Sequence, residues 1–343
     1  MSKIRVSVLG ATGYTGFELV KLMLMHPGIE IAHLTSESTP GKPYSELYPA
    51  LLGRCDKRLS PNDIELVAKD SDAAFLCLPH GASMDAAAAL ADRGLKVFDL
   101  SADYRINDAK LYEKTYNLEH KHTEWLAKAV YGLAEIFTEE IKQADLVAVP
   151  GCYPTSILIP LIPLLKDGLI DTRFIIADSK SGVSGSGKKA TLTTHYCEAH
   201  EDFKPYAIMS HRHRPEIDHI IGRAAGKSTR VTFTPHLVPM NRGMISTIYT
   251  AASVEKEELM AAWHKAYADK PFVRMREDGS IPSAKYVANT PFIDIALYMD
   301  KKEAGPQIII VSAIDNLMKG ASSQAMQCFN LRIGFEETAC LSI

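Results

Sequence analysis

Cys152 is the side chain in this 343-residue sequence that is best suited to nucleophilic chemistry. It follows a short apolar run at 146–149 that predicts a strand, and it opens an apolar segment through Leu165 that predicts a helix. A thiol at the start of a helix lies near the positive end of the helix dipole, which lowers the thiol pKa and favours the thiolate. Pro154 is a residue that the first turn of a helix accepts. Cys152 is therefore predicted to be a nucleophile.

The other five cysteines occupy ordinary contexts and form no C-x-x-C pair; they are Cys55, Cys77, Cys197, Cys328 and Cys340. No signal peptide precedes the first glycine-rich segment, so we expect a cytoplasmic protein with free thiols. The histidines near Cys197 match no zinc-ligand spacing, and we expect no metal.

A base for the thiol is predicted in the segment 210–217, where His211 and His213 flank Arg212. An imidazole can accept or return a proton, and a guanidinium can hold an anion. A single histidine in such a segment is more often a solvated loop residue, so the prediction of a base depends on the presence of Cys152.

Glycines at 10, 13 and 16 follow an apolar run at 4–9 and open a helical segment. Such glycines let the backbone approach a pyrophosphate, whose charge the N–H groups of the helix start can hold. The spacing departs from G-x-G-x-x-G, but the strand–loop–helix context favours a dinucleotide. The predicted contacts are Gly10, Thr12, Gly13, Tyr14, Thr15 and Gly16.

The turn after the second predicted strand (29–34) bears on the choice between NAD and NADP. Ser36 and Ser38 favour the 2′-phosphate of NADP, whereas Glu37 would repel it if its side chain pointed inward. We therefore expect NADP(H), and the preference over NAD stays open at this stage.

Two fold patterns follow one another along the chain. Strands at 4–9, 29–34, 72–78, 96–100 and 146–149, with a helix at 83–93, predict an α/β fold with a Rossmann-type doubly wound parallel sheet. Strands at 173–178, 230–237, 244–252, 292–299 and 307–313, with one long helix at 256–268, predict an α+β domain with a largely antiparallel sheet.

The expected domains are a dinucleotide-binding domain at 1–150, completed by the C-terminal helical segment 315–343, and a catalytic and oligomerisation domain at 151–314. The long strands of the second domain suggest a homo-oligomer, either a dimer or a tetramer.

Composition narrows the class of partner. The 38 basic and 41 acidic residues nearly balance, which argues against nucleic acid, and the 46% hydrophobic content argues against disorder. No apolar run reaches the roughly 18–20 residues of a membrane span. A small-molecule substrate remains as the expected partner.

Eight motifs in order resemble the N-acetyl-γ-glutamyl-phosphate reductase family and, more broadly, the aspartate-semialdehyde dehydrogenase superfamily. They are GATGYTG at 10–16, LPHG at 78–81, SADYR at 101–105, GCYPT at 151–155, SGVSGSGKK at 181–189, HRHRPEI at 211–217, VPMNRGM at 238–244 and AIDNLMKGA at 313–321. The ordered set covers nearly the whole chain and is far more specific than any one motif.

The resemblance implies an NADP-dependent phosphorylating semialdehyde dehydrogenase of arginine biosynthesis. In this family's reaction Cys152 would attack the acyl phosphate of N-acetyl-γ-glutamyl phosphate and form a thioester, which hydride from NADPH reduces to N-acetylglutamate 5-semialdehyde. His211 would be the acid/base. The implied anion holders are Arg105, Arg212, Lys180 and Arg242, with the first two ranked highest. Further implied cofactor contacts are Pro79, Ser181, Gly182 and Asn316, the last orienting the nicotinamide amide.

Two related activities share this chemistry and differ in the substrate pocket. They are aspartate-semialdehyde dehydrogenase and the reductase of a carrier-bound α-aminoadipyl phosphate. A reading from another class, a nucleotide-binding sensor without catalysis, is disfavoured because Cys152 and His211 are both present.

Overall fold

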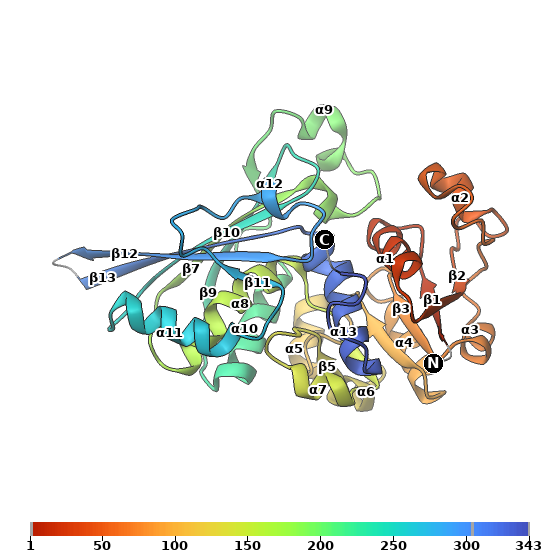
Figure 1. Cartoon of the computed structure of the whole chain (residues 1–343), viewed down its shortest axis with the longest axis horizontal. Coiled ribbons are helices and arrows are strands. Elements are labelled where there is room, and N and C mark those ends of the chain that lie inside the picture. The colour runs from red at the N-terminus through yellow and green to blue at the C-terminus, as the bar shows by residue number, and fades with distance from the viewer. Residues whose placement is uncertain (1–2, 303–304, 342–343) are drawn as a thin grey trace. The chain divides into compact units, whose positions relative to one another are not determined.

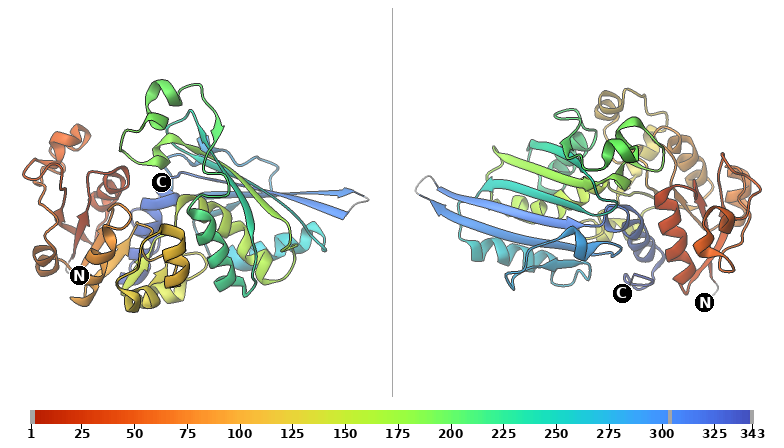
Figure 2. Two further views of the ribbon diagram at one scale, coloured as in Figure 1. Left: turned by 180° about the vertical axis from the view of Figure 1, so that it is seen from behind. Right: turned by 90° about the horizontal axis from the view of Figure 1, so that it is seen from above.

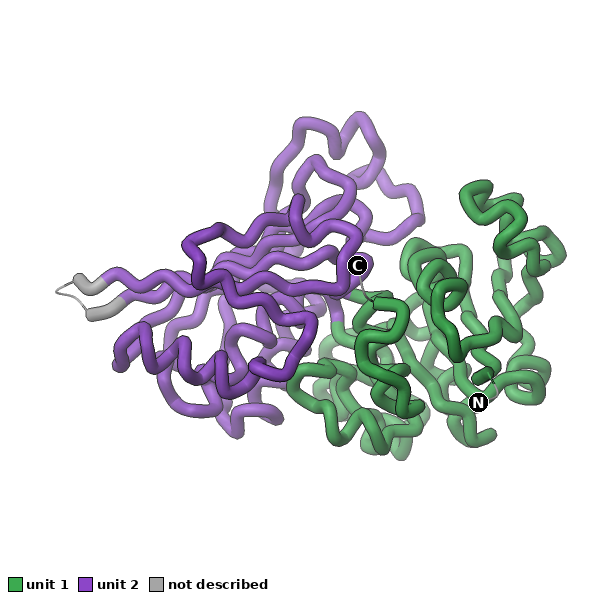
Figure 3. The backbone as a smooth tube through the Cα atoms, viewed as in Figure 1, with its two compact units in different colours: residues 1–150, 321–343 green, residues 151–320 purple. Residues whose placement is uncertain are grey.

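The computed structural model describes residues 3–302 and 305–341. The chain divides into two compact units, coloured separately in Figure 3. Unit 1 comprises residues 1–150 and 321–343, and unit 2 comprises residues 151–320. The return to the first domain is expected at 315, whereas the structure keeps 315–320 in unit 2.

Unit 1 is built on a six-stranded sheet with the order β2-β1-β3-β4-β6-β5 (Figure 1). The strands are β1 Ile4–Leu9, β2 Ile29–Leu34, β3 Ala73–Leu76, β4 Lys96–Asp99, β5 Val130–Tyr131 and β6 Leu146–Ala148. Every neighbouring pair is parallel. The predicted Rossmann-type parallel sheet is thus confirmed.

Helices alternate with these strands, as parallel pairing requires. They are α1 Tyr14–Met25, α2 Tyr44–Leu47, α3 Ile64–Asp70, α4 Ser83–Asp92, α5 Ala109–Tyr116, α6 Thr123–Lys128, α7 Thr138–Gln143 and, after a π-helical turn at Met318–Ser322, α13 Ser323–Ile333. The sequence predicted α1, α4 and the tail helix. The two-residue strand β5 and the short helices are too brief to produce a readable period.

The two faces of the unit 1 sheet are covered by different helices. Ala74 and Leu76 of β3 face one side and belong to a buried cluster with Leu90 of α4. Phe75 and Phe98 lie on the other side, and the ring of Phe329 in α13 lies 5.7 Å from each of them. Alternate residues of one strand therefore pack against helices from distant parts of the sequence, with α13 completing the second layer.

Unit 2 holds a seven-stranded mixed sheet with the order β11-β12-β13-β10-β7-β9-β8. Its strands are β7 Ile175–Gly182, β8 Lys204–Pro205, β9 Val231–Val238, β10 Met244–Ala251, β11 Val273–Met275, β12 Ile293–Lys302 and β13 Gly305–Ile314. Four of the six pairings are antiparallel; β7 with β9 and β11 with β12 are parallel. The predicted, largely antiparallel sheet is confirmed.

The helices of unit 2 are α8 Cys152–Lys166, α9 Tyr196–Ala199, α10 His213–Ala225, α11 Lys256–Tyr267 and α12 Ala284–Val287. α8, α10 and α11 lie on one face of the sheet (Figures 1 and 2). The sequence predicts one long helix among the later strands, at 256–268, but α10 is also long, with 13 residues. α10 begins at His213, the last residue of the His-Arg-His turn.

Tyr153–Leu165, almost the whole of α8, is buried although the helix contains Pro160 and Pro163. Each internal proline removes the hydrogen bond to the carbonyl four residues earlier. Those carbonyls belong to Ser156 and Ile159, and they accept the hydroxyls of Ser312 and Tyr267 respectively. Strand β13 and helix α11 thus donate hydrogen bonds to the two carbonyls that the prolines leave without a helical partner. These bonds hold α8 on the sheet.

The opposite face of the unit 2 sheet carries side chains that reach solvent. Tyr249 of β10, Tyr298 of β12 and Ile309 of β13 are 37–40% exposed. No described helix of the chain is both long enough and apolar enough to cross a membrane.

We expect Phe329→Ala to destabilise the protein by about 3 to 5 kcal/mol, because it empties the space between α13 and the sheet. Equilibrium denaturation by urea, followed by circular dichroism, measures this change. Met25→Ala is the matched control, since Met25 is 63% exposed and its replacement should change stability by about 0.5 kcal/mol or less. Equal effects of the two substitutions would contradict the packing described for α13.

Candidate active site

Cys152 is the first residue of α8, and Gly151 precedes it as the N-cap in extended conformation. The thiol-bearing residue is half-buried, whereas the rest of the helix to Leu165 is buried. Gly320 packs against it: a methyl group placed on Gly320 would lie 2.7 Å from Cβ of Cys152. The nucleophile predicted from the sequence thus stands at the N-terminal end of a rigidly buried helix, where the helix dipole favours a thiolate.

Helix α10 packs against α8 and brings the His-Arg-His turn beside Gly151. Glu216, fully buried in the first turn of α10, accepts a 3.0 Å hydrogen bond from the N–H of Gly151. A side chain on Gly151 would collide with the ring of His213. Two residues of the predicted motif therefore lie against the residue immediately before Cys152.

His211 lies in an aromatic environment. Its ring centroid is 5.6 Å from that of Tyr153, 5.4 Å from Tyr206 and 5.4 Å from Phe233. Burial, with the neighbouring charge of Arg212 as a second cause, lowers the pKa of His211 to about 4. The imidazole is therefore neutral at physiological pH.

The proton of the neutral His211 ring can be assigned from its backbone contact. Nδ1 accepts a 3.1 Å hydrogen bond from the backbone N–H of His213, so it carries no hydrogen. In the neutral ring the hydrogen must then be on Nε2. His211 consequently presents a proton donor in this arrangement, and Nδ1 could accept a proton only after losing its backbone bond.

The glycine loop of unit 1 leads directly from β1 into α1. Gly10 has φ +76°, and a Cβ there would lie 2.6 Å from the carbonyl oxygen of Cys77, so only glycine fits. Tyr44 donates to the carbonyl of Ala11 at 2.8 Å, and Tyr48 donates to that of Thr12 at 2.7 Å. Gly13 is the N-cap of α1, and the first turn contains Tyr14, Thr15 and Gly16 without an acidic residue. The loop therefore fits an anionic ligand at the start of α1.

A cluster of hydroxyls lies beside this loop. Ser36 Oγ lies 3.3 Å from Thr12 Oγ1, 3.2 Å from Ser38 Oγ and 3.1 Å from Thr39 Oγ1. The carboxylate of Glu37 accepts the backbone N–H of Asn62 at 2.7 Å. Glu37 is thus held by the backbone N–H of Asn62, and hydroxyl groups lie on either side of it at Ser36 and Ser38.

Two other predicted residues of unit 1 lie in loops that follow strands. Arg105 is buried; its Nε donates to Val149 O at 2.8 Å and one terminal nitrogen donates to Leu100 O at 2.9 Å. Pro79 is exposed in the loop after β3. Asp103 holds that loop, since its carboxylate accepts the N–H of Gly81 at 2.9 Å and pairs with His80 Nδ1 at 2.5 Å.

The remaining predicted cations belong to unit 2 and have different surroundings. Arg212 is exposed at the N-cap of α10, and among the described residues its side chain has no hydrogen-bond or ion-pair partner. Lys180 pairs with Asp178 at 2.7 Å and lies on the opposite face of β7 from buried Ser179 and Ser181. Arg242 pairs with Asp315 at 2.9 Å.

The predicted cofactor contacts of unit 2 are tied together by hydrogen bonds. Asn316 Oδ1 accepts the N–H of Gly243 at 2.8 Å, and Nδ2 donates to Ser184 Oγ at 2.9 Å. Gly182, which follows Ser181 at the end of β7, donates to the carbonyl of Gly243 at 2.9 Å. One N–H of the Asn316 amide is left over for another acceptor.

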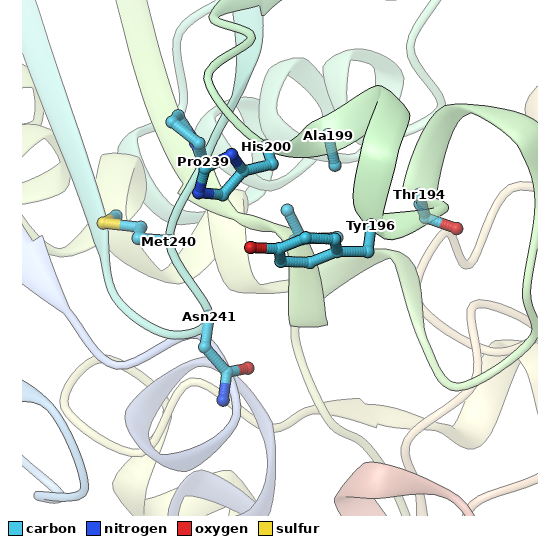
Figure 4. Close-up of a pocket in the computed structure, with 8 residues that line it drawn as sticks. Thr194, Tyr196, Ala199, His200, Pro239, Met240 and Asn241 are labelled. Atoms are coloured by element: carbon cyan, nitrogen blue, oxygen red, sulfur yellow. The ribbon is translucent and has the colours of Figure 1, made fainter.

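A cavity of about 310 Å³ lies beside the segment 181–189, which contributes Val183 to its lining (Figure 4). Its lining comprises Val183, Thr194, Tyr196, Ala199, His200, Pro239, Met240 and Asn241. None of these is a predicted site residue. Among the described residues, no three His, Cys, Asp or Glu side chains are grouped so as to hold a metal ion.

Several residues that the sequence did not indicate lie beside the predicted site residues. Thr39 extends the serine pattern at 36 and 38, so that signal was readable. Glu216 stands in the quoted HRHRPEI motif, but nothing in the spacing shows that its carboxylate reaches Gly151. Asp315 and Gly320 stand in the last motif, and their partners Arg242 and Cys152 become evident only in the fold.

The chain matches two family descriptions that together cover most of its length. Residues 5–144 match "Semialdehyde dehydrogenase, NAD binding domain", and residues 152–316 match "Semialdehyde dehydrogenase, dimerisation domain".

Solved structures show the same fold at low sequence identity. Aspartate semialdehyde dehydrogenase II from Vibrio cholerae, complexed with ASA, has a TM-score of 0.73 and 17% identity, covering 97% of this chain and 99% of that one. The Candida albicans aspartate semialdehyde dehydrogenase with NADP has a TM-score of 0.71 and 13% identity, covering 96% and 99%.

Curated relatives are much closer in sequence. The N-acetyl-γ-glutamyl-phosphate reductase of Rhodopirellula baltica is 46% identical over 347 residues and covers 99% of both chains. That of Pelotomaculum thermopropionicum is also 46% identical, over 341 residues, covering 99% of this chain and 98% of its own. The motifs, the two-unit fold and this full-length identity establish that the chain belongs to the N-acetyl-γ-glutamyl-phosphate reductase family.

Proposed function

We propose that the chain reduces N-acetyl-γ-glutamyl phosphate to N-acetylglutamate 5-semialdehyde and phosphate, using NADPH, in cytoplasmic arginine biosynthesis. The observation that carries the proposal is Cys152 at the first position of α8, with the His-Arg-His turn and Glu216 packed beside Gly151. The full-length relatives named for this reaction support the choice of substrate.

Cys152 is the proposed nucleophile. Its thiolate attacks the acyl carbon, the bond from that carbon to the phosphate oxygen breaks, and phosphate leaves with the electron pair. The product of this step is a thioester on Sγ. After hydride reaches the thioester carbon, the resulting thiohemiacetal collapses to the aldehyde and returns the electron pair to sulfur. The helix dipole at the start of α8 stabilises the thiolate both before attack and after release.

NADP(H) is the proposed cofactor, and the residues of unit 1 fit it. The loop Gly10–Gly16 would hold the pyrophosphate at the start of α1, and Ser36 and Ser38 would meet the 2′-phosphate. The Asn62 contact of Glu37 supports NADP over NAD, because it engages the carboxylate that would otherwise repel that phosphate. Pro79, Ser181, Gly182 and Asn316 are the further proposed contacts. The chemistry that the bound cofactor supplies is hydride donation.

His211 is the proposed acid. Its Nε2–H can donate a hydrogen bond to the oxyanion that develops on the substrate carbonyl, and its low pKa keeps the ring neutral while it does so. His213 is a second candidate for the base that removes the thiol proton, because its ring contacts Gly151 while Nδ1 of His211 is engaged by a backbone N–H. The two histidines of the turn would then divide the acid and base roles.

Arg105 and Arg212 are the proposed holders of the substrate carboxylate and phosphate. Arg212 is exposed, and its side chain has no partner among the described residues, which leaves its whole guanidinium fork for an anion. The ammonium of Lys180 is already paired with the carboxylate of Asp178, so it ranks below Arg212; the guanidinium of Arg105 donates to two backbone carbonyls.

We also propose a homo-oligomer formed through unit 2. The match of residues 152–316 to a dimerisation domain supports this, as do the exposed Tyr249, Tyr298 and Ile309 on the sheet face opposite α8. Light scattering should give a dimer or a larger assembly, and a monomeric mass at micromolar concentration would contradict the proposal.

The direct test of the reaction is phosphate-dependent oxidation of N-acetylglutamate 5-semialdehyde, followed by the absorbance of NADPH. Wild type should turn over with NADP faster than with NAD. Cys152→Ser should lower kcat at least 1,000-fold, on the order expected when a nucleophile is removed. Cys197→Ser is the control, because Cys197 is exposed on α9 and should leave the rate unchanged. Faster turnover of aspartate semialdehyde would instead favour aspartate-semialdehyde dehydrogenase, and dinucleotide binding without turnover would favour the sensor.

Alkylation by iodoacetamide separates the two histidine roles, because only the thiolate reacts. His213→Ala should slow alkylation of Cys152 at pH 7, whereas His211→Ala should leave that rate nearly unchanged and lower kcat by roughly 100-fold or more. The pKa of about 4 keeps His211 neutral from pH 8 down to about 5, so its protonation should affect kcat/KM only below about pH 5. If His211→Ala slows alkylation and His213→Ala does not, His211 is the base.

A further inference from the structure

Asp315, at the end of β13, is a fully buried carboxylate that accepts hydrogen bonds from three separate segments of unit 2. Arg242 donates from Nε at 2.9 Å and from a terminal nitrogen at 3.3 Å. The backbone N–H of Asn289 donates at 2.6 Å, and those of Leu317 and Met318 donate at 2.7 and 3.0 Å. This carboxylate therefore joins the β9–β10 loop, the loop after α12 and the turn after β13.

Asp315 and Arg242 form an ion pair. A buried carboxylate is tolerated only when a cation and hydrogen bonds replace its hydration, and Arg242 is the cation that contacts it. The charge of a guanidinium already engaged by a buried carboxylate is largely compensated. Arg242 is therefore poorly suited to hold a second anion, although its residue type suggested that role.

The turn that Asp315 organises ends against the proposed nucleophile. The carbonyl of Asp315 accepts the N–H of Gly320 at 2.9 Å, while its carboxylate holds Leu317 and Met318. Gly320 in turn lies against Cys152, with a methyl at Gly320 falling 2.7 Å from Cβ and 3.3 Å from Cα of the cysteine. The position of Gly320 depends on Asp315, and the space beside Cys152 depends on Gly320.

We propose that Arg242 and Asp315 are positioning residues for Cys152, acting through the turn 315–320, and that Arg242 does not bind the substrate. The inference rests on the proposed role of Cys152 as nucleophile. Displacement of the turn would shift the wall beside the thiol and change its access to an attacking geometry, without removing any contact to a substrate anion.

A double-mutant cycle tests the pair with Arg242→Met, Asp315→Asn and the combination of both. Arg242→Met alone leaves a buried carboxylate without its cation, and the combination removes that charge. We expect Arg242→Met to lower kcat and the iodoacetamide alkylation rate of Cys152 at least tenfold, with KM for phosphate and for the semialdehyde within about threefold of wild type. The double variant should be no worse than the more impaired single variant in either measurement.

Two further variants keep the result interpretable. Arg242→Lys retains the positive charge and should recover part of the alkylation rate even if Arg242→Met is poorly folded. Arg173→Met is the matched control, because Arg173 pairs with Asp171 at 2.8 Å at the surface of the same unit and should leave both rates unchanged.

Multiplicative losses in the double variant, with KM raised tenfold or more by Arg242→Met and the alkylation rate unchanged, would show that Arg242 binds substrate and would overturn the inference. Failure of the proposed function is distinguishable, since wild type would then not turn over the semialdehyde. In that case the alkylation rates of Cys152 would still test the Arg242–Asp315 pair. The melting temperatures of wild type, the two single variants and the double variant would show whether the two residues are coupled.

Discussion

The placement of Cys152 depends above all on the burial of α8. Residues 153–165 of this helix are enclosed by the sheet of unit 2 and by α10 and α11, and its first residue is the cysteine. The prolines at 160 and 163 would leave buried carbonyls without partners if Ser312 and Tyr267 did not donate to them. A helix held in this way gives its first turn little freedom, and a nucleophile is best placed on such a rigid element.

The chemistry around this helix start combines groups with distinct electrostatic roles. The helix dipole favours the thiolate, and the aromatic surroundings of His211 keep that imidazole neutral with its proton on Nε2. Glu216 holds the N–H of Gly151, and Asp315 with Arg242 holds the turn that carries Gly320. The buried carboxylates of Glu216 and Asp315 thus hold backbone groups in place, whereas Arg212 is exposed.

The sequence could predict those features that leave a local pattern. Local residue patterns predicted β1, β2, β9, β10 and β13, and the glycine loop was found because it must follow a strand and open a helix. The residue types at Cys152 and in the His-Arg-His turn indicated a nucleophile and an acid/base. The length of helix α10 was not evident from the sequence, because its apolar positions are few and it starts with a run of charged and imidazole side chains.

Features that depend on contacts between distant segments could not be predicted. The direction of Glu37 is decided by Asn62, a residue whose place beside it follows from the fold. The pairing of Arg242 with Asp315 joins positions 73 residues apart, and no local pattern in the sequence indicates it. Which histidine faces Gly151 likewise depends on how α10 packs against α8, a tertiary contact without a sequence signal.

If Cys152 carries the acyl group as a thioester, as we propose, mass spectrometry should detect the trapped acyl-enzyme. The protein is mixed with N-acetylglutamate 5-semialdehyde and NADP in the absence of phosphate, quenched in acid and digested. We expect the peptide containing Cys152 to gain the mass of an N-acetylglutamyl group, and added phosphate or hydroxylamine to remove it. NADPH formation in a burst without any acylated Cys152 peptide, or acylation at another residue, would contradict the account.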